Sequence, residues 1–498
     1  MRRELTNDEC RMTNGRSTLA VVVLHSLLVT SALAAPLAFE SLFPAGGQIG
    51  ARVETLVSGK GLEKETPLVW SSDPHVVVLG GDKPKKFFLN IAKDAVPGPY
   101  LIRLYNEADA SPPRIIEVGK FEEVLEKESN DTLADAKKAE GKMNVTFNGV
   151  LEKAGDVDTF AIRAQKGKRI RFALHGYALG SPMDPAMRLL NDRGVEVAAG
   201  HDTHNLDPRI EYTPAADGAL YVQLFAFAHP PAADVSFKGS AAHVYRLMVT
   251  DDAKAAVALS EPGKITLPAV LNGCISKAAE EDAYTFTAKK GDDLQISVRA
   301  QRMRSLLDAT LRIEDETGKS LQQADDADKD SLDPTLRWKA PKDGEFKLIV
   351  GDRFQHGSAE HLYELTVKPF VPSLSGTLDT HAYRLEAGKS VEVKVTVKTN
   401  GTFAGKIKAQ AVQLPTGVTA ESVDVSAKGG EVKLTLKATA EVVANQAPFA
   451  VEIVTSAPDA VETVTASYAV PFTEPRGDLL IMTDTHPWLT VVAGKKKP

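Results

Sequence analysis

Hydrophobic and polar residues alternate along several short segments of this chain. Residues 391–397 read Val-Glu-Val-Lys-Val-Thr-Val, and residues 432–436 read Val-Lys-Leu-Thr-Leu. The same period of two recurs at residues 245–249 and 363–367. Side chains of a β-strand point alternately to opposite faces, so this pattern predicts strands with one buried face. Glycine and proline turns separate the segments, and the sequence therefore predicts an all-β protein.

One stretch of the sequence occurs twice. Residues 155–160 read Gly-Asp-Val-Asp-Thr-Phe, residues 281–286 read Glu-Asp-Ala-Tyr-Thr-Phe, and both lead into the same order of turns. The matched residues are 124 or 126 positions apart, and they include Lys166 and Lys290, Asp184 and Asp308, Gly194 and Gly318, Asp207 and Asp333, and Asp217 and Asp343. The length changes fall in turns and loops, where they cost least. Each copy is therefore predicted to be one folding unit.

The order of strands and turns predicts tandem β-sandwich domains of two kinds, jelly-roll-like and immunoglobulin-like. The predicted parts are a signal peptide (1–34), an immunoglobulin-like sandwich (36–120), a first repeat with an acidic entry linker (121–250), a second repeat (263–368), an immunoglobulin- or fibronectin-like sandwich (375–473) and a loose tail (474–498). A chain of 498 residues is long enough for several such domains.

Composition narrows the classes of partner. Hydrophobic residues make up 43% of the chain and charged residues 25%, as in ordinary soluble domains. The formal net charge is −7 and is spread along the chain. A nucleic-acid partner is excluded on this ground, because no basic stripe is present to neutralise phosphates.

The beginning of the chain reads as an export signal. Arg16 precedes a mostly apolar run at residues 17–33, and Ala32-Leu33-Ala34 fits a small-x-small cleavage site, with Met12 as an alternative start to Met1. A membrane anchor is the other interpretation, but the run is short and is followed by the cleavage pattern. No later segment is long and apolar enough to span a bilayer.

Cysteine usage agrees with export into a bacterial envelope. Cys10 and Cys274 are the two cysteines of the sequence, and Cys10 would be removed with the signal peptide. The mature protein would then have no internal disulfide, unlike small secreted eukaryotic domains. The sequence predicts a secreted, periplasmic or cell-surface location.

An acidic segment precedes the first repeat and is the strongest candidate site. Residues 126–131 read Glu-Lys-Glu-Ser-Asn-Asp, and alternate side chains of an extended segment face one side. The turn at residues 156–158 could complete a shell of oxygen ligands, of which calcium takes about six to eight. The candidate ligands are Glu126, Glu128, Asn130, Asp131, Asp156 and Asp158. The same charge pattern is also typical of a solvated acidic linker.

The two repeats resemble bacterial pre-peptidase C-terminal domains, which are β-sandwich modules found beside secreted proteases and in collagenases. The resemblance rests on residues 128–131, residues 156–160, the Asp184-Pro185 step, Gly194 and the Asp217-Gly218 turn. It covers residues 121–250 more fully than residues 263–368. Residues 42–47, which read Leu-Phe-Pro-Ala-Gly-Gly, resemble the immunoglobulin-like domain that precedes such modules in large bacterial surface proteins.

This resemblance implies a calcium site where the entry linker meets the sandwich. It implicates the same six residues, Glu126, Glu128, Asn130, Asp131, Asp156 and Asp158, as ligands. The second repeat lacks the acidic entry and has Tyr284 where the first has Asp158, so it is expected to have lost the site.

Other candidates are weaker. His201 and His204 flank Asp202, and His356 and His361 form a second pair, but neither pair comes with the Glu-bearing helix of a zinc protease. Phe225, Phe227 and His229 could line a ligand-binding face, although alternating aromatics near a strand end are more often core. Nucleophile elbows, phosphate-binding loops, dinucleotide fingerprints and zinc-protease motifs are all absent from the sequence.

The sequence therefore predicts a secreted, multi-domain binding or adhesion protein that is not an enzyme, with a calcium-stabilised first repeat. Its predicted partner is an extracellular glycan, a protein or an envelope polymer. The alternatives are an accessory subunit or targeting region of a separate secreted peptidase or hydrolase, and an enzyme whose site has no recognised motif.

Overall fold

The computed structural model describes residues 37–493, apart from residues 63–66, 108, 137–140, 204–205, 230–232, 234, 252–257, 304, 328–331, 404, 457–460 and 471–481. Strands form nearly all of its regular structure, and the helical part consists of α1 (Leu133–Ala136) and the 3-10 turns η2 (Tyr177–Leu179) and η3 (Gln301–Met303). The predicted all-β fold is thus confirmed. Within this part of the chain no helix has the length and hydropathy needed to cross a membrane. The predicted signal peptide lies outside the described residues.

Two four-stranded sheets come first in the chain. One has the order β1 (Ala38–Phe43), β3 (Arg52–Lys60), β6 (Lys86–Ile91) and β5 (Val76–Gly80). The other has the order β2 (Gly46–Gln48), β8 (Arg114–Gly119), β7 (Gly98–Tyr105) and β4 (Leu68–Ser71). Leu89 of β6 and Ile116 of β8 are fully buried in one hydrophobic cluster, as expected for two facing sheets.

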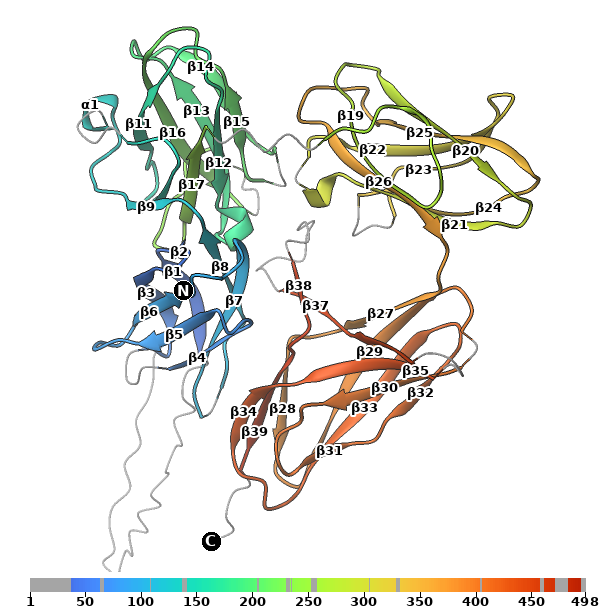
Figure 1. Cartoon of the computed structure of the whole chain (residues 1–498). Coiled ribbons are helices and arrows are strands. Elements are labelled where there is room, and N and C mark those ends of the chain that lie inside the picture. Colours follow the sequence, from blue (N-terminus) through green and yellow to red (C-terminus); the bar gives the residue numbers. More distant parts are fainter. Residues whose placement is uncertain are drawn as a thin grey trace, which may run out of the picture. The chain divides into compact units, whose positions relative to one another are not determined.

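The first repeat forms two further sheets (Figure 1). One has the order β15 (Arg209–Tyr212), β12 (Ile170–His175), β17 (Val244–Thr250), β10 (Val145–Val150) and β9 (Glu122–Leu125). The other has the order β11 (Asp158–Ala164), β16 (Gly218–Ala228), β13 (Met183–Leu190) and β14 (Glu196–Gly200). Phe147 of β10 and Phe160 of β11 stack between the sheets with their ring centroids 4.5 Å apart. The acidic entry linker follows β9, which pairs in parallel with β10.

The second repeat has the same order in its eight matched strands, as its sequence match to the first predicts. Its entry strand differs, because β18 (Gly263–Lys264) pairs with the strand that begins at Glu281, whereas β9 pairs with β10. One sheet has the order β19 (Ala269–Cys274), β26 (Leu362–Pro369), β21 (Asp293–Arg299) and β24 (Thr335–Lys339). The other has the order β18 (Gly263–Lys264), β20 (Glu281–Ala288), β25 (Gly344–Asp352), β22 (Ala309–Asp315) and β23 (Ser320–Ala324). Phe286, Trp338 and Phe346 pack edge to face in its core.

Two of the shared aspartate pairs accept hydrogen bonds from the backbone of turns. The buried carboxylate of Asp207 accepts hydrogen bonds from the backbone N–H groups of residues 176–178, and Asp333 does the same for residues 300–302. Asp217 and Asp343 each accept one from the backbone N–H of the matched lysine turn, at 2.7 and 2.6 Å. The order of turn motifs that revealed the repeat therefore reflects backbone hydrogen bonding, not ligand chemistry.

The described residues from Ser373 onward form four sheets. Their orders are β27 (Ser373–Leu378), β29 (Ser390–Asn400), β33 (Gly430–Ala438), β31 (Val418–Ala420); β32 (Val423–Val425), β30 (Lys406–Val412), β35 (Ala450–Ser456), β36 (Val461–Thr465); β28 (Ala382–Glu386), β39 (Trp488–Val492), β34 (Asn445–Pro448); and β37 (Tyr468–Ala469), β38 (Thr483–Asp484). The alternation predicted at residues 391–397 is present, since Val393, Val395 and Val397 are buried between exposed neighbours.

The prediction of a loose tail from residue 474 is wrong for residues 488–492. These residues form β39, the middle strand of its sheet, which pairs in parallel with β28 and antiparallel with β34. Trp488, Leu489 and Val491 are buried. A strand that pairs with a segment about a hundred residues earlier gives no local turn signal in the sequence, so its short apolar run was not recognised.

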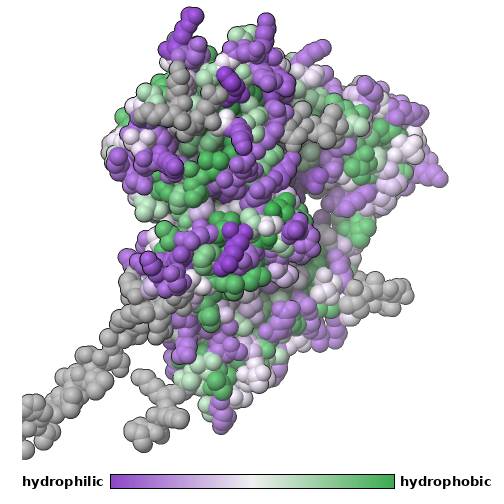
Figure 2. Space-filling view, turned by 60° about the vertical axis from the view of Figure 1, so that its left-hand side comes forward, coloured by the Kyte–Doolittle hydropathy of each residue, from purple (hydrophilic) through white to green (hydrophobic). Residues whose placement is uncertain are grey.

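Hydrophilic side chains cover much of the face drawn in Figure 2, and hydrophobic side chains show between them in small areas. This distribution fits sandwiches whose apolar residues lie mainly between their sheets.

Leu489 provides a test of the corrected C-terminal boundary. Its side chain has 0% exposure, so Leu489→Ala is expected to lower the free energy of unfolding of the last domain by about 2–5 kcal/mol. Val443→Ala is the control, because Val443 is 79% exposed and its loss should change stability by less than about 0.5 kcal/mol. Both are measured by urea denaturation. Equal stability of the two variants would contradict the placement of β39 in the core.

Candidate metal centre

The entry linker and the start of β11 bring acidic side chains together. Carboxylate oxygens of Glu126, Glu128 and Asp158 lie within 4.8 Å of one another. Glu126 and Glu128 belong to the linker after β9, whereas Asp158 is the first residue of β11. The backbone N–H of Thr159 donates to the backbone oxygen of Asn130 at 3.0 Å, which fixes the linker against β11. Like charges at this separation repel unless a proton or a cation lies among them.

Tyr245 of β17 lies at the centre of this group. Its hydroxyl contacts Glu126 Oε2 at 2.9 Å and Asp158 Oδ2 at 2.5 Å. A phenol has one proton to donate, so it satisfies one of the two carboxylates at a time. Gly149 of β10 makes room for the contact, because a Cβ there would lie 2.1 Å from the Tyr245 hydroxyl. The pair therefore needs a further positive charge, either a proton or a cation.

Burial increases the need of Glu126 and Asp158 for a proton or a cation. It raises the pKa of Asp158 above the ordinary carboxyl value, and the nearby Glu126 charge raises that pKa further. Burial also raises the pKa of Glu126, although hydrogen bonds from the Val150 N–H and from Tyr245 oppose the shift. For the more exposed Glu128, burial and then the Asp156 charge raise the pKa. At neutral pH the metal-free group is therefore expected to retain a proton.

Several buried oxygens of this group lack a hydrogen-bond donor among the described residues. They are Asn130 Oδ1, Asp156 Oδ1 and Asp158 Oδ1. Lys153 Nζ lies 4.0 Å from Asp156 Oδ1, which is an ion pair but too long for a hydrogen bond. Burying unpaired carboxylate and amide oxygens is costly, whereas a hard cation would use them as ligands. The residues present therefore fit a cation of the calcium type.

The structure places the six predicted ligands in two groups. Glu126, Glu128 and Asp158 converge directly, and Asn130 and Asp156 are buried with unpaired oxygens beside them. Asp131 differs, since its side chain is exposed and its backbone oxygen accepts from the Thr159 hydroxyl at 3.3 Å. Sequence reasoning missed Tyr245, although the same residue type recurs at the matched position of the second repeat, Tyr363.

The second repeat contains a similar group with fewer carboxylates at the tyrosine. The expectation that Tyr284 stands where the first repeat has Asp158 is wrong: the strand register places Asp282 at the position of Asp158 and Tyr284 at that of Phe160. Tyr363 corresponds to Tyr245, because each tyrosine hydroxyl donates to the matched aspartate. The Tyr284 and Tyr363 hydroxyls are 2.8 Å apart, and Tyr363 donates to Asp282 Oδ2 at 2.5 Å. Each hydroxyl thus has a partner, and one buried carboxylate remains where the first repeat has two.

The histidine candidates that the structure describes do not form a comparable group. His201 is exposed, with its Nδ1 3.4 Å from Asp202, and His204 lies outside the described residues. The buried His361 is hydrogen-bonded through Nδ1 to the Ser358 hydroxyl at 2.9 Å. Phe225 and Phe227 pack with Phe237 as an aromatic cluster.

No family model matches this chain, and no curated protein matches it. Among solved structures, it is similar to the pre-peptidase C-terminal domain of a collagenase from Bacillus anthracis, with 20% identity over 22% of this chain and 97% of that one, at a TM-score of 0.17. It is also similar to SGBP-B of a mixed-linkage glucan utilization locus of Bacteroides ovatus, solved with a mixed-linkage heptasaccharide, with 10% identity, coverage of 68% and 77%, and a TM-score of 0.16. A Salmonella alpha-2-macroglobulin matches at 11% identity, with coverage of 92% and 31% and a TM-score of 0.17. Likenesses at these TM-scores assign no function to the chain.

Without metal, the stability of the first repeat is expected to fall as the pH rises. The pKa values of Asp158 and Glu126 are raised by folding, so the folded state binds more protons than the unfolded chain above the ordinary carboxyl pKa of about 4. Stability is then lost progressively from about pH 4 upward until both groups are ionised. The measurement is the melting temperature in EDTA as a function of pH.

Asp158→Asn should flatten this dependence, because it removes the most strongly perturbed carboxyl of the group. Asp131→Asn serves as the control, since the Asp131 side chain is exposed, and it should keep the slope of the unmutated chain. The same slope in Asp158→Asn and in the unmutated chain would show that the pair does not govern the pH response.

Proposed function

We propose that this chain is an exported, non-catalytic binding protein, and that calcium stabilises the entry to its first repeat. In this proposal two pre-peptidase C-terminal-like repeats lie between immunoglobulin-like domains. The observation that carries it is the buried Asp158 carboxylate, which shares one tyrosine hydroxyl with Glu126 while its Oδ1 has no donor among the described residues. A divalent cation would resolve both problems at once.

The donor set favours calcium over other metals. Every candidate ligand is a carboxylate or amide oxygen, which suits a hard cation and not zinc, whose usual ligands are sulfur and imidazole nitrogen. The ligands come from an irregular linker and from a strand end, and calcium tolerates irregular geometry better than magnesium does. The residues that would hold it are Glu126, Glu128, Asn130, Asp156 and Asp158, with Asp131 at the exposed rim.

Calcium at this position would tie the entry linker to the sandwich. The linker is already fixed at its start, where the buried Arg246 donates to Glu123 Oε1 at 2.7 Å, and at its end by the bond from Thr159 to Asn130. Between these points Glu126 and Glu128 face Asp158, so repulsion favours local opening when no cation is bound. Bound calcium would therefore fix the linker along its whole length.

The proposed partner is an extracellular glycan, a protein or an envelope polymer. The predicted export signal, the modular β-sandwich architecture and the lack of a known catalytic motif in the sequence support this class over an enzyme. The net charge of −7 disfavours a polyanionic partner.

Calcium titration of the full mature chain tests the metal site. We expect saturable binding by calorimetry and a rise in the melting temperature, equivalent to about 2.7 kcal/mol when calcium is at a hundred times its dissociation constant. Asp158→Asn should abolish both effects, because it removes a buried ligand charge while keeping the side-chain shape.

Asp282→Asn is the matched control in the second repeat, and it should bind calcium like the unmutated chain. Absence of calcium binding at millimolar concentration, or equal loss in the two variants, would refute the site in the first repeat.

A further inference from the structure

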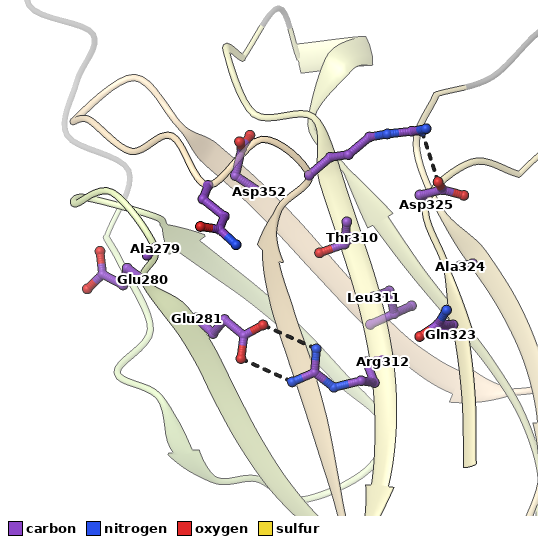
Figure 3. Close-up of a pocket in the computed structure, with 12 residues that line it drawn as sticks. Ala279, Glu280, Glu281, Thr310, Leu311, Arg312, Gln323, Ala324, Asp325 and Asp352 are labelled. Carbon is purple, nitrogen blue, oxygen red and sulfur yellow. Dashed lines mark hydrogen bonds and ion pairs between the residues drawn. The ribbon is translucent and has the colours of Figure 1, made fainter. Parts of the chain in front are cut away.

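A cavity of about 540 Å³ opens on the outer sheet face of the second repeat. Its walls come from β20, β22 and β23 and from the loop after β25 (Figure 3). Glu281 of β20 and Thr310 of β22 lie on either side of Gly351 of β25 in one cross-strand row. Because Gly351 has no side chain, nothing projects from the sheet between the side chains of Glu281 and Thr310, and this leaves space between them.

In the first repeat, a phenylalanine side chain occupies the position that matches Gly351. Phe225 corresponds to Gly351, and its cross-strand neighbour Ala186 corresponds to Thr310. The Phe225 ring stacks on Phe237 with centroids 4.4 Å apart. The strands around this position have the same order in both repeats, so the cavity does not follow from the fold and depends on the residues of the second copy.

The charged side chains of the cavity already have partners. Arg312 makes two hydrogen bonds to Glu281, at 3.1 and 3.0 Å, and Arg353 pairs with Asp325 at 2.8 Å. Figure 3 shows Arg312 pointing across the sheet toward Glu281. These pairs fix planar groups at the wall and leave little net charge on them.

The two remaining carboxylates of the lining are engaged with the backbone. Asp352 accepts from the N–H groups of Asp308, Phe354 and His356 at 2.9 to 3.1 Å. Glu280 accepts from the Ser276 hydroxyl at 2.8 Å and from the Lys277 N–H at 2.9 Å. These hydrogen bonds occupy the carboxylate oxygens but leave their charge, so a lining with four carboxylates and two guanidinium groups disfavours an anionic ligand.

The uncharged polar groups of the cavity are still available. The side chains of Thr310, Gln323 and Gln355 line it, and none makes a hydrogen bond to another residue of the described chain. A hydroxyl and two amides offer both donors and acceptors. Sugar hydroxyl groups also donate and accept hydrogen bonds. A lining of fixed polar side chains therefore matches a sugar better than it matches an apolar ligand.

We propose that this cavity binds a neutral oligosaccharide, with Thr310 and Gln323 as hydrogen-bonding residues and Gly351 as the position that keeps it open. The proposal rests on the proposed role as a binding protein and specifies its ligand class. The Glu281–Arg312 and Arg353–Asp325 pairs act as positioning residues that shape the walls.

The test is calorimetric titration of the full mature chain with neutral hexasaccharides, namely cellohexaose, maltohexaose, xylohexaose, mannohexaose and chitohexaose. Hexagalacturonate serves as the charged probe. We expect at least one neutral probe to bind and the charged probe to bind at least about tenfold more weakly. Gly351→Phe copies the residue of the first repeat and should reduce affinity by at least about tenfold, because the ring would occupy the cavity.

Two further variants keep the test decisive if Gly351→Phe folds poorly. Thr310→Val preserves shape and removes one hydroxyl, so it should weaken binding by about 2–10-fold at unchanged melting temperature. Thr287→Val is the matched control and should bind like the unmutated chain, since Thr287 is exposed on β20 and lies outside the cavity lining.

Failure of every neutral probe at millimolar concentration, equal binding of the charged probe, or full affinity in folded Gly351→Phe and Thr310→Val would overturn the proposal. Calcium titration of the same samples separates this result from the metal site. Calcium binding without sugar binding would refute only the proposed sugar site. Sugar binding without calcium binding would refute only the proposed metal site.

Discussion

One hydroxyl proton cannot satisfy two buried carboxylates, and the chemistry of the first repeat follows from this constraint. Tyr245 contacts both Glu126 and Asp158, and the backbone around it is built to allow the contact. Gly149 leaves space for the hydroxyl, and the bond from Thr159 to the Asn130 backbone brings the linker to the strand. The missing positive charge must come from a proton or a metal, so occupancy of the site and stability of the linker are linked.

The second repeat shows that the sandwich itself does not require this charge. Asp282 occupies the place of Asp158, and the hydroxyls of Tyr284 and Tyr363 form a chain that ends on its carboxylate, with no second carboxylate at the tyrosine. The cores of both repeats are closed by aromatic side chains between the same sheets. Two carboxylates meet one tyrosine hydroxyl in the first copy and a single carboxylate does so in the second, so the fold itself does not require the additional carboxylate of Glu126.

The features that the sequence predicted are those with a local signal. Alternation marked strands such as β29, and the shared turn aspartates marked the repeat because each bonds nearby backbone N–H groups. The spacing of acidic residues predicted Glu126, Glu128 and Asp158 as metal ligands. What was missed depends on pairing between distant segments. Tyr245 reads as an ordinary core position of an alternating strand, and β39 acquires its partner β28 through a long connection.

Gly351 illustrates the same limit and its physical cause. In the sequence it is one glycine after a strand of hydrophobic residues, which suggests a bend or a bulge. Only the register of three strands shows that it separates Glu281 from Thr310 and that Phe225 occupies its place in the first repeat. The two copies thus differ at two points of one scaffold, with buried carboxylates at the linker in the first and an open cavity on the sheet face in the second. Neither feature uses a residue of the other, so the metal site and the cavity can each be lost without removing the chemical basis of the other.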